Sequence, residues 1–220
     1  DYVSTQKIDG NVADIMVGIL KGCEIAGVEL IGGETAEHFR QRDYDLAGFC
    51  TGIVEKSEIV DGRLIRSGDK IIGLPSSGLH SNGYTLVNDM LWRQKIFYEE
   101  GYTEAWGGGE IKDPSPTPEL LTPTTIYAKQ IEELMGEIPI MGMAHITGGG
   151  LEENISRIVP EELKVNIDWS SWKRPDIFNK IQTLGEVEES EMRKVFNCGI
   201  GFCMIIPRDV DYGVQIGEVV

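Results

Sequence analysis

The sequence predicts a mixed α/β (α+β) protein built from two domains. Short apolar runs that are typical of strands alternate along the chain with stretches of helical periodicity. A charged, turn-rich stretch at residues 55–69 separates a shorter N-terminal part from a longer C-terminal part. We therefore expect one domain at residues 1–60 and another at residues 61–220.

The N-terminal part is expected to contain one helix and two strands. Residues 11–27 carry apolar side chains at helical spacing, with Asn11 as the expected N-cap and Gly27 just past the end. Residues 28–31 form a short apolar run, which predicts a buried strand that leads into Gly32 and Gly33. Residues 44–54 are apolar on both faces, as expected of a strand covered on both sides.

The C-terminal part alternates strands with helices. Strands are predicted at residues 70–74, 138–146, 164–168 and 199–206, and helices at 82–92, 151–159, 177–183 and from Pro123 onward. Residues 98–118 are rich in glycine and proline and predict a surface loop. Both chain ends read as strands that are cut, so we expect a chain truncated at both ends.

Composition excludes several classes of protein. The net charge of −16 disfavours general nucleic-acid binding, which needs a basic surface. No apolar run approaches the ~20 residues of a membrane span, and the first residues show no signal peptide, so we expect a cytoplasmic protein with no membrane partner. The four cysteines and three histidines lack metal-ligand spacing and predict neither a redox nor a zinc site.

Three glycine-bearing loops follow predicted strands, at residues 32–37, 75–83 and 147–150. Glycine lets the backbone approach a ligand closely, and the amide groups of a following helix can bind an anion. Hydroxyls such as Ser81 and Thr147 either cap that helix or bind phosphate oxygens. One such loop alone is the ordinary entrance to a helix, but three in one chain favour ligand binding. Glu152 and Glu153 argue against the third loop unless their side chains point away.

Several side chains have both a functional and a structural interpretation. Glu34 and Glu37 are hard oxygen donors that suit Mg²⁺, although surface carboxylates are an equal interpretation. His80 is either a general acid or base or a histidine bonded to the backbone at a helix entrance. His145 lies in an apolar run and is interpreted as a core histidine. Asn197 either binds a ligand or makes a turn. The P-loop and G-x-G-x-x-G signatures are absent.

Seven short motifs together resemble the AIR synthetase family, in the family's order and over nearly the whole chain. They occupy residues 32–37, 44–49, 52–56, 76–84, 121–124, 145–150 and 196–201. The resemblance implies two α/β domains, a homodimer formed by the N-terminal domain, and the use of ATP with Mg²⁺. It also implies a phosphorylated small-molecule substrate, because the family closes formylglycinamidine ribonucleotide to 5-aminoimidazole ribonucleotide and releases ADP and phosphate.

The resemblance also assigns roles by position. The nucleotide would contact Gly32, Gly33, Glu34, Thr35 and Glu37, with Glu34 on the metal. His80 would be catalytic, and the substrate with its phosphate would contact Ser81, Asn82, Thr147, Gly148, Gly149, Gly150 and Asn197.

Two departures from the family pattern bear on this assignment. The family's Gly-rich nucleotide loop and metal-binding aspartates would precede Asp1, and residues 38–42 replace its usual Pro- and Gly-containing loop. Two alternatives stay open: another ATP-using member of the superfamily that resembles formylglycinamidine ribonucleotide synthetase, or a non-catalytic phosphate-binding or dimerisation module.

Overall fold

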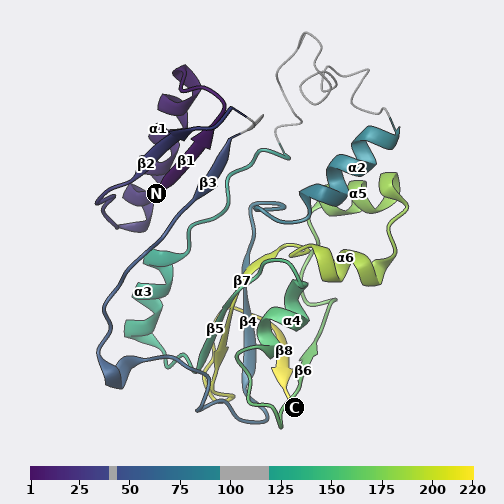
Figure 1. Ribbon diagram of the computed structural model, residues 1–220. Helices are drawn as coiled ribbons and strands as arrows, with labels where there is room; N and C mark the ends of the chain where they lie inside the picture. Colours follow the sequence, from purple (N-terminus) through teal and green to yellow (C-terminus); the bar gives the residue numbers. More distant parts are fainter. Residues whose placement is uncertain (40–43, 95–118) are drawn as a thin grey trace. The chain divides into compact units, whose positions relative to one another are not determined.

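The computed structural model describes residues 1–39, 44–94 and 119–220 (Figure 1). The loop predicted at residues 98–118 lies wholly outside this part of the chain. The described residues form two compact units. The first contains Asp1–Ile59 with Ile126–Glu137, and the second contains Val60–Thr125 with Ile138–Val220.

The first unit is a small three-stranded sheet with two helices. Strand β1 (Tyr2–Thr5) pairs in parallel with β2 (Glu34–Glu37) and antiparallel with β3 (Asp45–Ala47). Helix α1 (Gly10–Ala26) contacts α3 (Ala128–Glu137), which belongs to this unit although it begins more than 100 residues after α1 ends. A short 3₁₀ turn (Lys56–Glu58) lies near the end of the first stretch.

Three sequence predictions in this unit are wrong. The apolar residues 28–31 are not a strand, and β2 begins only after the glycines, at Glu34. Helix α1 is capped by Asp9, whose carboxylate accepts the Asn11 amide at 3.0 Å, so Asn11 is not the N-cap. A long strand covered on both sides was expected at residues 44–54, but only the three residues of β3 form a strand, and all three are exposed.

The second unit is built on an antiparallel five-stranded sheet in the order β5-β7-β4-β8-β6 (Figure 1). Its strands are β4 (Lys70–Pro75), β5 (Gly142–His145), β6 (Val165–Ile167), β7 (Ile200–Ile206) and β8 (Val214–Val219). Central β4 pairs with β7 and β8, which lie more than 120 residues later in the sequence. The order of the sheet therefore depends on contacts that no local pattern reveals.

Two apolar clusters hold this unit together. Helix α4 (Gly150–Ser156) contacts β5 and β6, and its fully buried Leu151 and Ile155 join sheet residues such as Ile71 and Ile205. The second cluster lies among α2 (Tyr84–Gln94), α5 (Asp176–Gly185) and α6 (Glu189–Val195), and centres on Phe178, Met192 and Phe196. Burial of each such large side chain contributes roughly 1.5–3 kcal/mol.

The predicted fold class, mixed α/β with two units, is confirmed, whereas some boundaries are wrong. Residues 123–127 are not helical, and α3 begins only at Ala128. Hydrogen bonds from Ser77 to the Pro123 carbonyl and between Ser81 and Thr124 hold that segment in its non-helical course. Helix α6 was not predicted. No helix in the described ranges combines the length and apolar composition of a bilayer span.

Candidate functional site

Two glycine-bearing loops of the second unit meet beside a cleft. One loop, Ser76–Gly83, follows β4, and the other, Thr147–Gly150, follows β5. The Gly148 amide donates to the Asn82 side-chain oxygen at 3.2 Å and so joins the two loops. The cleft has a volume of about 680 Å³ and is lined by Asn82, Gly83, Thr85, Leu86, Asp89, Gly148, Gly149, Glu153, Glu191, Lys194 and Val195. Three of the predicted substrate residues, Asn82, Gly148 and Gly149, therefore come together here.

His80 braces the first loop from inside. Its backbone is left-handed, with φ 59°, and its side chain is buried. The ring Nε2 accepts the amides of Ser77 at 3.1 Å and Thr125 at 3.4 Å, which requires a neutral ring protonated at Nδ1. Burial, and secondarily the neighbouring His145, lower the pKa of His80. This geometry fits the interpretation of a histidine bonded to the backbone, and the catalytic role stays a prediction.

His145 lies at the end of β5 and is not a core histidine. Its side chain is exposed, with the ring centroid 6.4 Å from that of His80 and 6.4 Å from that of Phe202. Desolvation by the protein packed around the ring lowers its pKa. Its neighbours Ala144 and Ile146 are both in the core. Strand alternation therefore directs His145 to the opposite face, and this period-2 pattern was the sequence signal that could have identified it.

Ser81 lines a second, smaller hollow. About 340 Å³ is enclosed by His80, Ser81, Tyr84 and residues 120–124. The Ser81 hydroxyl lies 3.1 Å from that of Thr124, and the Tyr84 hydroxyl donates to the Leu120 carbonyl. These bonds fasten the segment at 120–124 to the first loop, so the predicted Leu-Thr-Pro-Thr motif belongs to the site.

The Thr147–Gly150 loop does not offer its glycine amides to an anion. Besides the Gly148 bond to Asn82, Gly149 donates to the Lys194 carbonyl at 2.9 Å and Gly150 donates to the Thr147 carbonyl at 3.1 Å. The Thr147 hydroxyl donates to the Asn154 side chain. In this structure the three amides connect parts of the chain to one another, and a contact between them and a phosphate stays a prediction.

Glycine is required in this loop by close packing. A Cβ on Gly150 would lie 1.7 Å from the Arg193 carbonyl oxygen, and Gly150 has a φ of 68°. A Cβ on Gly149 would lie 2.6 Å from the Glu153 carboxyl group. The Glu153 side chain therefore lies against the loop, where its negative charge disfavours a bound anion, and it forms an ion pair with Arg157.

Asn197 is a buried brace in this structure, and its assignment to the substrate stays a prediction. Its amide nitrogen donates to the carbonyls of Gly78 at 2.8 Å and Leu79 at 3.2 Å. Its oxygen accepts from the Ser76 hydroxyl at 2.9 Å and the Gly199 amide at 2.8 Å. With both ends of the carboxamide engaged inside the protein, Asn197 holds the first loop in place.

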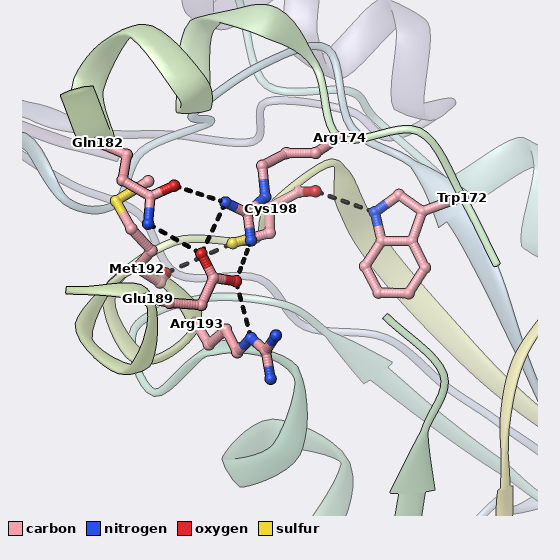
Figure 2. Close-up of polar contacts among 7 residues, drawn as sticks. All are labelled: Trp172, Arg174, Gln182, Glu189, Met192, Arg193 and Cys198. Carbon is pink, nitrogen blue, oxygen red and sulfur yellow. Dashed lines mark hydrogen bonds and ion pairs between the residues drawn. The ribbon is translucent and has the colours of Figure 1, made fainter. Parts of the chain in front are cut away.

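An ion-pair network precedes Asn197 in the sequence and joins α5 to α6 (Figure 2). Arg174 donates to Gln182 and to both carboxylate oxygens of Glu189, and Arg193 donates to one of them at 2.9 Å. The hydrogen bond from Arg174 is the largest cause that lowers the pKa of Glu189 to about 2.

The same region fixes the chain at Cys198. The Trp172 indole donates to the Cys198 carbonyl at 3.0 Å, and the Cys198 thiol donates to the Met192 carbonyl (Figure 2). Burial raises the pKa of Cys198 to about 11, so this thiol is an inert structural group.

The predicted nucleotide residues of the first unit do not form a phosphate-binding helix entrance. Gly32 and Gly33 precede strand β2, not a helix. Gly33 packs against Asp1, whose carbonyl accepts the Glu34 amide at 3.0 Å, and a Cβ on Gly33 would collide with the Asp1 side chain. Thr35 is half-buried in the strand. The expected strand–loop–helix junction at residues 32–37 is therefore wrong.

Glu34 and Glu37 do not converge on a metal. They stand three residues apart on one strand, so their side chains leave opposite faces. Glu37 accepts the Ile8 amide at 2.8 Å. Within residues 1–39, 44–94 and 119–220 no group of three or more His, Cys, Asp or Glu side chains is arranged to hold a metal ion. Glu34 as a single metal ligand stays a prediction.

The structure thus defines a two-unit protein of mixed α/β class, with a ligand-sized cleft between the loops that follow β4 and β5. Residues 66–214 match the family profile described as "AIR synthase related protein, C-terminal domain", and residues 1–54 match the profile of the N-terminal domain. The chain belongs to the family of AIR synthase related proteins.

Relatives of known name agree with this family. The chain is 49% identical over 99% of its length to a phosphoribosylformylglycinamidine cyclo-ligase of Thermoanaerobacter pseudethanolicus, of which it spans 66%. It is 48% identical to the enzyme of that name from Desulfitobacterium hafniense, of which it spans 61%. The chain therefore spans slightly less than two-thirds of the length of these relatives.

A solved structure supports the fold independently. T. maritima PurL, in a structure with AMPPCP, matches all of this chain and 32% of its own with a TM-score of 0.53 at 14% identity. At that identity the likeness establishes the arrangement of strands and helices alone.

Proposed function

We propose that this chain provides the substrate-binding loops of an ATP-dependent cyclo-ligase of purine biosynthesis. The proposed reaction converts formylglycinamidine ribonucleotide and ATP into 5-aminoimidazole ribonucleotide, ADP and phosphate. The observation that carries the proposal is the 49% identity, over 99% of the chain, to a relative named for this activity. The cleft between the two loops supplies a ligand-sized site of about 680 Å³.

The proposed reaction requires the site to hold formylglycinamidine ribonucleotide and ATP in line with each other. ATP would phosphorylate the formyl oxygen, the amidine-side nitrogen would attack that carbon, and the oxygen would leave as phosphate. Orientation of bound groups is a large part of such catalysis. Asn82 can donate from its amide nitrogen to a ligand in the cleft. The cleft lining also contains Lys194, which can attract an anionic ligand, together with the acidic residues Asp89, Glu153 and Glu191.

A proton must leave the nitrogen that closes the ring. His80, the predicted catalytic residue, is buried with Nε2 engaged by two amides. His145 is exposed beside it, and desolvation favours the neutral ring that can accept a proton. We therefore include both in the proposal, with His145 exchanging the proton and His80 holding the loop.

ATP and Mg²⁺ enter the proposal on different grounds. ATP is supported by the named relatives and by a fold shared with a protein crystallised with AMPPCP. For Mg²⁺, the described carboxylates do not fit a complete site, because Glu34 and Glu37 diverge. Glu34 contributes a single ligand at most, so no step of the reaction is assigned to the metal through this chain.

The assembly proposal rests on the exposed apolar surface of the first unit. Phe49 is 91% exposed and Ile53 is 102% exposed, and Leu46 and Val54 are also exposed. Apolar surface of this kind is typical of a protein interface. We propose that it pairs with a second copy to make a homodimer. Sedimentation of the wild-type chain and of Ile53→Asp tests this, and a wild-type monomer at micromolar concentration contradicts it.

We also propose the boundaries of the two domains and the location of the protein in the cell. Matches of the two family profiles at residues 1–54 and 66–214 support domains at 1–60 and 61–220, although Ile126–Glu137 packs with the first of the two compact units. A cytoplasmic location is proposed from the biosynthetic role of the named relatives.

The experiment that tests the reaction is release of ADP with each candidate substrate. The protein is mixed with ATP, Mg²⁺ and formylglycinamidine ribonucleotide, and 5-aminoimidazole ribonucleotide is identified by mass. Parallel reactions contain formylglycinamide ribonucleotide with glutamine, the substrates of the formylglycinamidine ribonucleotide synthetase alternative. Turnover of only the latter pair overturns the proposal. Binding of the ribonucleotide without turnover favours the non-catalytic module.

His80→Gln and His145→Gln separate the two histidine roles. We expect His145→Gln to lower turnover at least tenfold and to remove the dependence of turnover on a group whose pKa lies below the ordinary value of histidine. Turnover of His145→Gln equal to that of the wild type would exclude His145 as the proton acceptor.

A further inference from the structure

We propose that Asn154 is a positioning residue of the cleft, which fixes the Thr147–Gly150 loop so that Asn82 presents its amide nitrogen to the ligand. Asn154 is not among the residues that line the cleft. It acts through Gly148 and Asn82. The identity of the ligand rests on the proposed function, whereas the positioning rests on the contacts described below.

Asn154 is a hydrogen-bonding centre inside α4. Its side chain is 6% exposed. Its amide nitrogen donates to the carbonyls of Thr147 at 3.2 Å, Gly148 at 3.2 Å and Gly150 at 2.7 Å. Its oxygen accepts from the Thr147 hydroxyl at 3.2 Å and from Arg157 at 3.1 Å. One buried carboxamide therefore holds three of the four carbonyls of the loop.

Gly148 transmits this arrangement to the cleft. Its carbonyl is held by Asn154, and its amide donates to the Asn82 side-chain oxygen at 3.2 Å. An amide N–H can bond only to the oxygen of a carboxamide, so this contact settles which way Asn82 is turned. Within the described part of the chain, the Asn82 amide nitrogen makes no hydrogen bond.

The resulting site selects for hydrogen-bond acceptors. Asn82 lines the cleft, and the end of its side chain that remains available is a double N–H donor. Such a group binds phosphate, hydroxyl or carbonyl oxygens, which a phosphorylated ribonucleotide carries. Without Asn154 the Gly148 peptide would be released, and Asn82 would lose the partner that fixes its orientation.

Asn154→Asp is the sharpest perturbation because it preserves the size of the side chain. The new carboxylate would face three carbonyl oxygens that need a donor, so the loop must open. Arg157 and the Thr147 hydroxyl could still bond to the other oxygen. Asn166→Asp makes the same chemical change at an exposed position on β6, and Ile155→Val weakens core packing on α4 without touching the loop.

The test is hydrogen exchange of individual amides in the 220-residue chain, followed by nuclear magnetic resonance. In Asn154→Asp we expect the amides of Gly148, Gly149 and Gly150 to exchange at least tenfold faster than in the wild type, while the amides of the β4–β7 ladder keep their rates. The two control variants should keep the loop rates. Loop amides of Asn154→Asp that exchange at the wild-type rate would overturn the proposal.

A second variant covers the case in which Asn154→Asp does not fold. Asn82→Ala removes the acceptor of the Gly148 amide from a half-buried position without disturbing the core. We expect the Gly148 amide to exchange at least tenfold faster, while Gly149 and Gly150, held by other partners, keep their protection. An unchanged Gly148 amide would break the proposed link between the loop and Asn82.

Binding of formylglycinamidine ribonucleotide, measured by calorimetry, distinguishes a positioning residue from a merely structural one. We expect Kd to rise at least tenfold in Asn154→Asp and to stay at the wild-type value in Ile155→Val, even if both variants lose stability. A Kd unchanged in Asn154→Asp counts against the proposal. A wild-type chain that does not bind this nucleotide contradicts the proposed function instead, and the exchange rates then decide the positioning role by themselves.

Discussion

Replacement of Gly150 by alanine should destabilise the second unit, whereas the same change at Gly148 should not. Gly150 has a φ of 68°, and its new Cβ would lie 1.7 Å from the Arg193 carbonyl oxygen. At Gly148 the nearest atom to a new Cβ is the Asn82 oxygen at 3.9 Å, which is ordinary contact. The two glycines are two positions apart in one loop, so each is the control for the other.

The expected size follows from two terms. A left-handed alanine costs about 1–2 kcal/mol. Relief of the collision requires α4 to move from α6, which breaks the bond between the Gly149 amide and the Lys194 carbonyl, worth roughly 1 kcal/mol. The sum, about 2–3 kcal/mol, corresponds to a fall in Tm of roughly 4–12 °C for a chain of this length.

The assay is urea unfolding followed by tryptophan fluorescence, since Trp169 and Trp172 both lie in the second unit. Gly148→Ala should stay within ~0.5 kcal/mol of the wild type, as substitutions without a named mechanism do. Equal unfolding midpoints for Gly150→Ala and the wild type would refute the reasoning from close packing.

Three further predictions concern the surroundings of the site. The pKa of Glu189 is lowered from 4.5 to about 2, so the ionised carboxylate stabilises the folded chain above pH 4.5, and this stabilisation is lost as the pH falls toward 2. Because the Glu189 side chain is 40% exposed, we expect it to contribute only about 1 kcal/mol to the free energy of unfolding. When the free energy of unfolding is measured as a function of pH, the Glu189→Gln variant should not show this loss. A thiol reagent should modify exposed Cys50 first and should reach Cys198 and Cys203 only on unfolding, because both are buried and burial raises the pKa of each thiol. Mass spectrometry of the modified peptides will show the order, and early labelling of Cys203 would contradict its buried position. Asn197→Asp should cost at least ~2 kcal/mol in urea unfolding because two carbonyls lose their donor, whereas Asn179→Asp, at an exposed position, should be neutral.

Local patterns predicted the elements that build the sheet of the second unit. The apolar run at residues 70–74 became β4, and the run at 199–206 became β7, because both are buried on the two faces of a central strand. The same reasoning was wrong for residues 28–31 and 44–54, which are as apolar but stay largely exposed. Composition reports that a surface is apolar and does not report whether another part of the chain covers it.

Near the cleft, the sequence indicated two loops that meet there but not how their polar groups are used. The loops that carry His80 and Gly148 do meet at a cleft, as their glycines suggested. Whether the amides remain available depends on acceptors such as the Lys194 carbonyl, which lies 45 residues from Gly149. The same holds for Asn197, whose partners lie about 120 residues away. Only the three-dimensional structure shows that these groups are already bonded.

The place of β4 at the centre of its sheet has a consequence for biogenesis. Both neighbours of β4 are supplied by residues 200–219, so its two hydrogen-bonding edges stay unpaired until the ribosome has added well over a hundred residues. At ~5–20 residues per second, this interval lasts roughly 6–25 s. Through that time the nascent chain exposes a largely apolar strand to other chains, and a chaperone that shields strand edges would raise the yield of folded protein.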